Sequence, residues 1–113
     1  MAINYKNQGY NLTTTNLTTV LTISASTVAI IKEISVANDT NNTIAVDYFF
    51  RDVSASTDFK FYHTKITSNS HENAVHNALV LEEGDSLKFQ ADDEDAISGQ
   101  ISYALISRVG ENG

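Results

Sequence analysis

The chain has 113 residues, enough for one ordinary domain and too few for two, and it contains neither cysteine nor proline. Without cysteine it forms no disulfide and no thiolate metal site. Seven basic residues against 14 acidic ones give a net charge of −7, which argues against the basic face that a nucleic acid or an anionic membrane requires. No apolar run approaches the length of a membrane helix, and the first 15 residues lack the apolar core of a secretory signal.

Apolar and polar residues alternate with a period of two along most of the chain, which is typical of β-strands. Strands are expected at residues 19–25, 27–38, 43–51, 58–66, 86–91 and 97–108, with one more segment that leads through Val75, Leu79 and Leu81. Runs rich in Asn, Asp, Ser and Gly separate them, and these residues favour turns. Seven or eight short strands joined by polar turns predict a single all-β, antiparallel domain, either a sandwich or a barrel.

The apolar face of the strand at residues 27–38 is interrupted by a charge. One parity of this strand holds Val28, Ile30, Lys32, Ile34 and Val36 and is interpreted as the apolar face. Because Lys32 breaks that face, a bulge or a sheet edge is expected there.

The first 18 residues are polar, and we expect them to form an N-terminal arm outside the β domain. The domain itself is placed at residues 19–108, followed by a short tail at residues 109–113. Exposed aromatic residues in an arm suit contact with a partner protein. Partner contacts are therefore predicted at Tyr5, Tyr10, Asn11 and Leu12, with the backbone of the arm adding a strand to a neighbouring sheet edge.

Seven acidic residues gather between Glu82 and Gly99, which raises the question of a cation site or of acid–base catalysis. A calcium loop of the EF-hand type requires Gly at its sixth position and Glu at its twelfth. Counted from Asp92 or from Asp93, neither position carries the required residue. Glycosidase carboxylates face each other across a cleft, whereas residues 92–95 share one short loop. We interpret the acids as solvated hairpin turns at both ends of the strand at residues 86–91, with adventitious cation binding as the alternative.

The histidines indicate no catalytic or metal site either. His71 and His76 are five residues apart, whereas the helical zinc-protease motif requires a spacing of four. His63 lies in an aromatic strand and is expected to be a hydrogen-bonded sheet histidine. No phosphate-binding glycine loop and no nucleophile elbow is found. We predict no catalytic residue, no metal ligand and no cofactor, and a protein that is not an enzyme.

Three segments in a fixed order resemble a known family: TTVLTISASTVAIIKEISVAN, ALVLEEGDSLKFQ and AISGQISYALI. They resemble small virion structural proteins of tailed bacteriophages, those of cyanophages in particular. The resemblance covers most of residues 5–108 and is most specific at residues 79–90 and 97–106, with Gly84, Leu87, Phe89 and Gln90 as diagnostic positions. Family members commonly have Pro after the first strand, where this chain has Ser-Ala-Ser at residues 24–26. The resemblance implies a β-sandwich, often jelly-roll-like, that catalyses nothing.

The resemblance further implies a virion location, on the capsid surface, after synthesis in the host cytoplasm. The leading expectation is a capsid decoration (cement) protein that binds the outer face of the major capsid lattice. Its partners would be the major capsid protein or other virion proteins, and it would form a homo-oligomer such as a trimer. The alternatives are a neck- or tail-associated subunit and a carbohydrate- or receptor-binding sandwich. The last is disfavoured because the chain has no Trp and few aromatic residues outside its strands.

Overall fold

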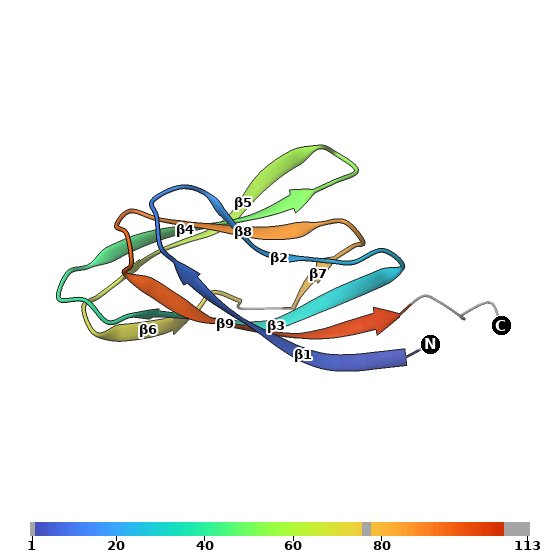
Figure 1. The fold of residues 1–113 in the computed structure, drawn as a ribbon, viewed down its shortest axis with the longest axis horizontal. Coiled ribbons are helices and arrows are strands. Elements are labelled where there is room, and N and C mark those ends of the chain that lie inside the picture. Colours follow the sequence, from blue (N-terminus) through green and yellow to red (C-terminus); the bar gives the residue numbers. More distant parts are fainter. Residues whose placement is uncertain (1, 76–77, 108–113) are drawn as a thin grey trace.

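The computed structural model describes residues 2–75 and 78–107, which form two antiparallel sheets packed face to face (Figure 1). Sheet A contains β1 (Ala2–Leu12), β9 (Ile97–Ser107), β3 (Thr27–Asn38), β6 (Ser70–Asn73) and β7 (Leu79–Leu81). Sheet B contains β2 (Thr18–Thr22), β8 (Ser86–Ala91), β4 (Ile44–Asp52) and β5 (Thr57–Ile66). The prediction of an all-β antiparallel sandwich is confirmed. In the described part of the chain no helix could cross a membrane.

The strand order is that of a jelly roll. β6 and β7 pair with different stretches of β3, residues 35–38 and 29–31, so together they act as one interrupted edge strand. Counted in this way there are eight strands, and the first pairs with the last, the second with the seventh, the third with the sixth and the fourth with the fifth. This nested pairing arises when one long hairpin folds over on itself, and it leaves one edge strand at each end of both sheets.

The core lies between the two sheets and is built from alternate residues of their inner faces. Its largest fully buried apolar side chains are Tyr48, Phe89, Leu12, Ile23, Ile31, Ile34, Ile44, Ile66, Leu81, Leu87, Ile101 and Val36. The aromatic ring of Tyr48 packs edge-on against Phe89 with 5.1 Å between ring centroids. Polar residues on the other parity face outward, which explains the period of two in the sequence.

The expected irregularity at Lys32 is a β-bulge. The register between β3 and β9 shifts between Ile31 and Glu33. After the bulge Ile34 and Val36 are buried, as predicted, but before it Ala29 and Ile31 are the buried residues. The prediction that Val28 and Ile30 share the core face is therefore wrong, because the extra residue reverses the parity of the strand.

The prediction of an N-terminal arm at residues 1–18, outside a domain that begins at residue 19, is also wrong. Residues 2–12 form β1, which pairs with β9 without a register shift from Ala2 opposite Ser107 to Leu12 opposite Ile97. The polar sequence of β1 conceals this strand because most of its side chains lie outside the core. Arg108 and the predicted tail at residues 109–113 lie outside the described residues.

The acidic turns on either side of β8 are not hairpins, contrary to the prediction. β8 belongs to sheet B, whereas β7 before it and β9 after it belong to sheet A. Each acidic segment therefore crosses from one sheet to the other. The reason is topological: in a jelly roll most strands that are neighbours in sequence lie in opposite sheets.

Candidate interaction surface

Asp85, one of the clustered acids, is buried rather than solvated. Its carboxylate accepts a hydrogen bond from the backbone N of Val53 (3.1 Å) and one from the backbone N of Glu82 (3.0 Å). A buried carboxylate is stabilised by such backbone donors. Asp85 therefore joins the turn between β4 and β5 to the segment that crosses between the sheets, and it is a structural residue.

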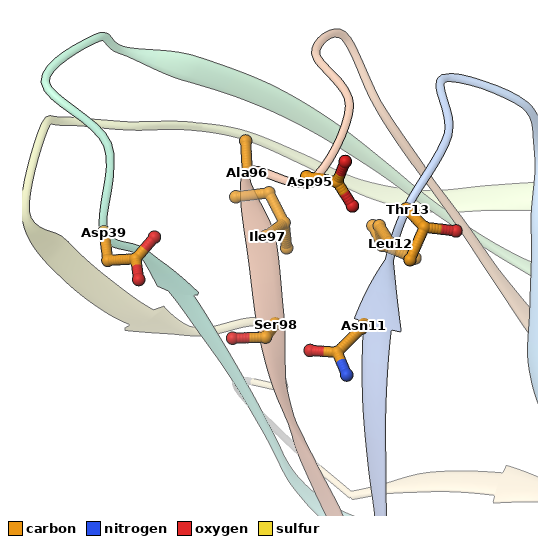
Figure 2. Close-up of a pocket in the computed structure, with 8 residues that line it drawn as sticks. All are labelled: Asn11, Leu12, Thr13, Asp39, Asp95, Ala96, Ile97 and Ser98. Carbon is orange, nitrogen blue, oxygen red and sulfur yellow. The ribbon is translucent and has the colours of Figure 1, made fainter.

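The other acidic segment borders a shallow hollow at one end of the sandwich. This hollow, of about 290 Å³, is lined mainly by the end of β1 and the start of β9, together with Asp39 and Asp95. Figure 2 shows that the two carboxylates come from different loops, with Ala96 between them in this view, while Asn11 and Ser98 lie on the two neighbouring strands. Within residues 2–75 and 78–107, no three His, Asp or Glu side chains are grouped to hold a metal ion. The hollow therefore offers no assembled ligand set.

His63 is a hydrogen-bonded sheet histidine, as predicted. Its Nδ1 lies 2.5 Å from Oδ1 of Asp47, across the β4–β5 pair, and the same oxygen is 3.5 Å from Nζ of Lys60. His71 lies exposed on β6, and His76 is outside the described residues. Asp47, Lys60 and His63 therefore form one polar group on the outer face of sheet B.

The four predicted contact residues have different environments. Tyr10 and Leu12 belong to the core, with 8% and 1% of their surfaces exposed, so their assignment as partner contacts is wrong. Asn11 is exposed and lines the hollow in Figure 2. Tyr5 is 81% exposed and remains a candidate contact.

Tyr10 is buried because sheet B covers the second half of β1. Its ring packs edge-on against Phe89 of β8, with 5.2 Å between centroids. Its hydroxyl donates a 2.7 Å hydrogen bond to the backbone O of Ser35 on β3. The side chain reaches β3 by crossing β9 at Gly99, where a Cβ would lie 1.9 Å from that same Ser35 oxygen. Burial raises the pKa of Tyr10 well above its usual range, and the nearby Tyr48 makes a smaller contribution in the same direction.

The outer face of sheet A carries an apolar surface near the start of β1. Two cross-strand rows of the sheet form it, the first from β1, β9 and β3 and the second also from β7. We call this the apolar surface: Ile3, Ile106 and Val28 in the first row, and Tyr5, Ala104, Ile30 and Val80 in the second. Tyr5, Val80 (57% exposed) and Ile3 (52%) contribute most of its accessible area, and Ala104 is buried among its neighbours. Contiguous exposed apolar side chains of this kind mark interaction sites.

The outer face of sheet B is charged by contrast. Arg51 and Lys88 both pair with Asp58, at 3.4 and 3.3 Å. The group formed by Asp47, Lys60 and His63 lies on the same face. β1, β3, β7 and β9 together carry only Lys6, Lys32 and Glu33 as charged residues. Among the described residues, all acidic side chains except Glu33 therefore lie in sheet B, in β6 or in the loops. The apolar surface is therefore the part of the described molecule best suited to meet another protein without desolvating charge.

Beside the apolar surface, β1 presents an unprotected sheet edge. Within the described residues β1 pairs only with β9, over 11 residues and with no bulge. The other three edges are blunted: β2 is five residues long and has a register shift, β5 has a register shift and carries charged side chains, and the last edge is split between β6 and β7. Natural proteins use these devices to prevent edge-to-edge pairing. β1 has none of them except a single lysine, Lys6.

Sequence reasoning found Tyr5 but missed the rest of the apolar surface. One signal was present: β9 is apolar on both parities at Ala104 and Ile106 as well as at Tyr103 and Leu105. The other signal was Lys32, because a bulge there turns Val28 and Ile30 to the outside. Both signals required knowledge of which strands are neighbours.

No protein-family model matches the chain, and no curated protein matches it. Among solved structures, one chain from the structure described as "Bacillus endospore appendages form a novel family of disulfide-linked pili" is similar to it. The two superpose with a TM-score of 0.52 at 9% sequence identity, over 94% of this chain and 86% of that one. At this identity the similarity shows a shared fold and nothing further.

Proposed function

We propose that this protein is a non-enzymatic structural subunit of a tailed-phage virion, a capsid decoration protein that binds the outer face of the major capsid lattice. The observation that carries the proposal is the apolar surface beside an unprotected edge strand, on a molecule whose described residues group no metal ligands. The resemblance of residues 79–90 and 97–106 to small virion proteins supplies the biological setting.

The apolar surface is expected to contact the capsid. Its seven side chains come from four strands and are all uncharged, whereas the opposite face of the sandwich carries ion pairs. Surfaces that bind proteins commonly centre on an aromatic anchor surrounded by aliphatic side chains, and Tyr5 with Ile3 and Val80 has this composition. A small contact suffices for each copy if an oligomer attaches at several points, since linked contacts raise the effective concentration.

Copy number on purified particles tests the location. Quantitative mass spectrometry should find the protein in numbers comparable to the major capsid protein. A much lower number, typical of the tail axis, would instead support a neck- or tail-associated subunit. Absence from particles would contradict both.

A matched pair of substitutions tests the surface. Val80→Lys places a charge in the apolar surface and should abolish attachment to particles lacking this protein. Val53→Lys makes the same change at a similarly exposed valine in the turn between β4 and β5 (50% against 57% exposed) and should leave attachment intact. Equal attachment of the two variants would show that another surface makes the contact.

A repeating subunit of a fibre is the second candidate, favoured by the fold shared with the endospore pilus chain. With no cysteine in its 113 residues, such a polymer could not be joined through disulfides of this sequence. Electron microscopy of the concentrated protein distinguishes the two candidates, since a fibre subunit should form filaments without capsids.

A further inference from the structure

The free edge of β1 is suited to one particular partner, a second copy of the same chain. We propose that β1 pairs antiparallel with β1 of a second copy about a twofold axis perpendicular to the sheet, joining two A sheets into one continuous sheet. An antiparallel strand pair of identical sequences is self-complementary, so a twofold axis satisfies both edges at once. This pairing uses the edge of β1 and, of the apolar surface, only Tyr5, and it is independent of the assembly that the protein serves.

The sequence of β1 favours one register. When the two strands overlap over their whole length, Asn7 lies opposite Asn7 of the second copy, and Tyr5 lies opposite Gly9 of the second copy. Tyr5 and Gly9 share the outer face of β1, and Tyr5 is 81% exposed. At Gly9 a Cβ would meet only the Gly99 oxygen, at 3.9 Å, so the backbone there is uncovered. Each Tyr5 ring would therefore cover the bare glycine of the other copy, an arrangement that stabilises strand pairs.

The neighbouring registers are less favourable. In the register centred on Lys6, the two lysines lie directly opposite each other, which is destabilising. In the register centred on Gln8, Gly9 lies opposite Asn7 and loses its aromatic cover. Only the full-length register combines the Tyr5–Gly9 contacts with Lys6 opposite the uncharged Gln8 of the second copy.

The charge distribution also favours self-pairing along this edge. Each copy carries a net charge of −7, so two copies repel except where their acidic groups are distant. β1 and its neighbour β9 contain no acidic residue. When two molecules pair along β1, no acidic residue therefore lies on the paired strands or on the strands next to them. Salt screens the repulsion between the more distant acidic residues.

A pair of opposite charge changes at Gln8 tests this register in the full chain. Gln8→Lys places an ammonium opposite Lys6 of the second copy, at two symmetry-related positions, and should raise the dimer Kd about fivefold. Gln8→Glu places a carboxylate there and should lower the Kd by a similar factor. Sedimentation velocity over a concentration series measures both, and an unchanged urea midpoint shows that the variants remain folded.

Thr19 provides the control, because it is exposed on β2, an edge strand of sheet B. Thr19→Lys and Thr19→Glu introduce the same charges and should leave the Kd close to that of the wild type. The proposal is overturned if the wild type is monomeric or trimeric at all concentrations, or if both Gln8 variants shift the Kd in the same direction. Attachment to particles is measured in a separate assay with the Val80→Lys variant. A negative result for dimerisation therefore does not contradict the proposed function, and a negative result for attachment does not contradict the pairing of β1.

Discussion

The two halves of β1 pair with the same strand, β9, but their side chains differ in burial. In the first half Tyr5 is 81% exposed, and the side chains from Ile3 to Gly9 lie outside the core. In the second half Tyr10 and Leu12 are buried, and Tyr10 contacts both sheets. The backbone pairing with β9 is continuous throughout, so pairing alone does not decide burial. The opposing sheet does: it covers the second half and leaves the first half available for interaction.

Replacing the buried tyrosine should produce the largest effect. Tyr10→Ala removes an aromatic ring from the core together with the hydrogen bond to Ser35, and should lower the free energy of unfolding by about 3–5 kcal/mol. Urea unfolding followed by circular dichroism measures it. A loss below about 1 kcal/mol would mean that the second half of β1 is not docked as described.

Gly99 should be the next most sensitive position. Gly99→Ala would place a Cβ 1.9 Å from the backbone O of Ser35 and 2.8 Å from the Tyr10 hydroxyl, so the strands must separate locally. We expect a loss of about 1–3 kcal/mol in the free energy of unfolding, measured with urea.

Gly9→Ala, on the adjacent strand, is the matched control. Its Cβ would meet nothing closer than 3.9 Å, and replacing a strand glycine stabilises by roughly 0.5 kcal/mol. Equal destabilisation by the two substitutions would contradict the crossing of Tyr10 over Gly99.

Alkaline pH should lower the free energy of unfolding because of the buried tyrosines, by less than the destabilising substitutions above. Burial raises the pKa of Tyr10, and also that of Tyr48, above the usual value. A raised folded-state pKa means that the unfolded chain loses its proton first. The stability is therefore complete below about pH 10 and falls above it, by about 1.4 kcal/mol per pH unit for each tyrosine.

Urea midpoints measured between pH 8 and pH 11 follow this decline. Tyr10→Phe removes one of the two titrating groups, so its stability should fall less steeply with pH than that of the wild type. Identical slopes would show that Tyr10 does not remain protonated in the folded state.

The exposed tyrosine should matter least for stability. Tyr5→Ala removes a side chain that is mostly in water, and the free energy of unfolding should change by less than about 0.5 kcal/mol. The same variant should weaken dimerisation, measured by sedimentation velocity, because it uncovers Gly9 of the second copy. A large loss of stability in the monomer would show instead that Tyr5 supports the fold.

Local pattern was sufficient for several features of this protein. The alternation in residues 43–51 and 86–91 predicted strands, the charge of Lys32 predicted either a bulge or a sheet edge, and His63 was expected to be a hydrogen-bonded sheet residue. These predictions succeeded because strand periodicity and local bulges depend on neighbouring residues along the chain.

Other features depended on which distant segments meet. The polar β1 gave no apolar period, because its partner β9 is some 90 residues away in sequence and supplies only backbone pairing along the first half. The acidic segments looked like hairpins until their flanking strands proved to lie in opposite sheets. By itself the sequence determined most of the strands, the polar segments between them and the acidic balance. Only the tertiary structure decided which apolar side chains face water, because burial depends on the opposing sheet and not on the strand that carries them.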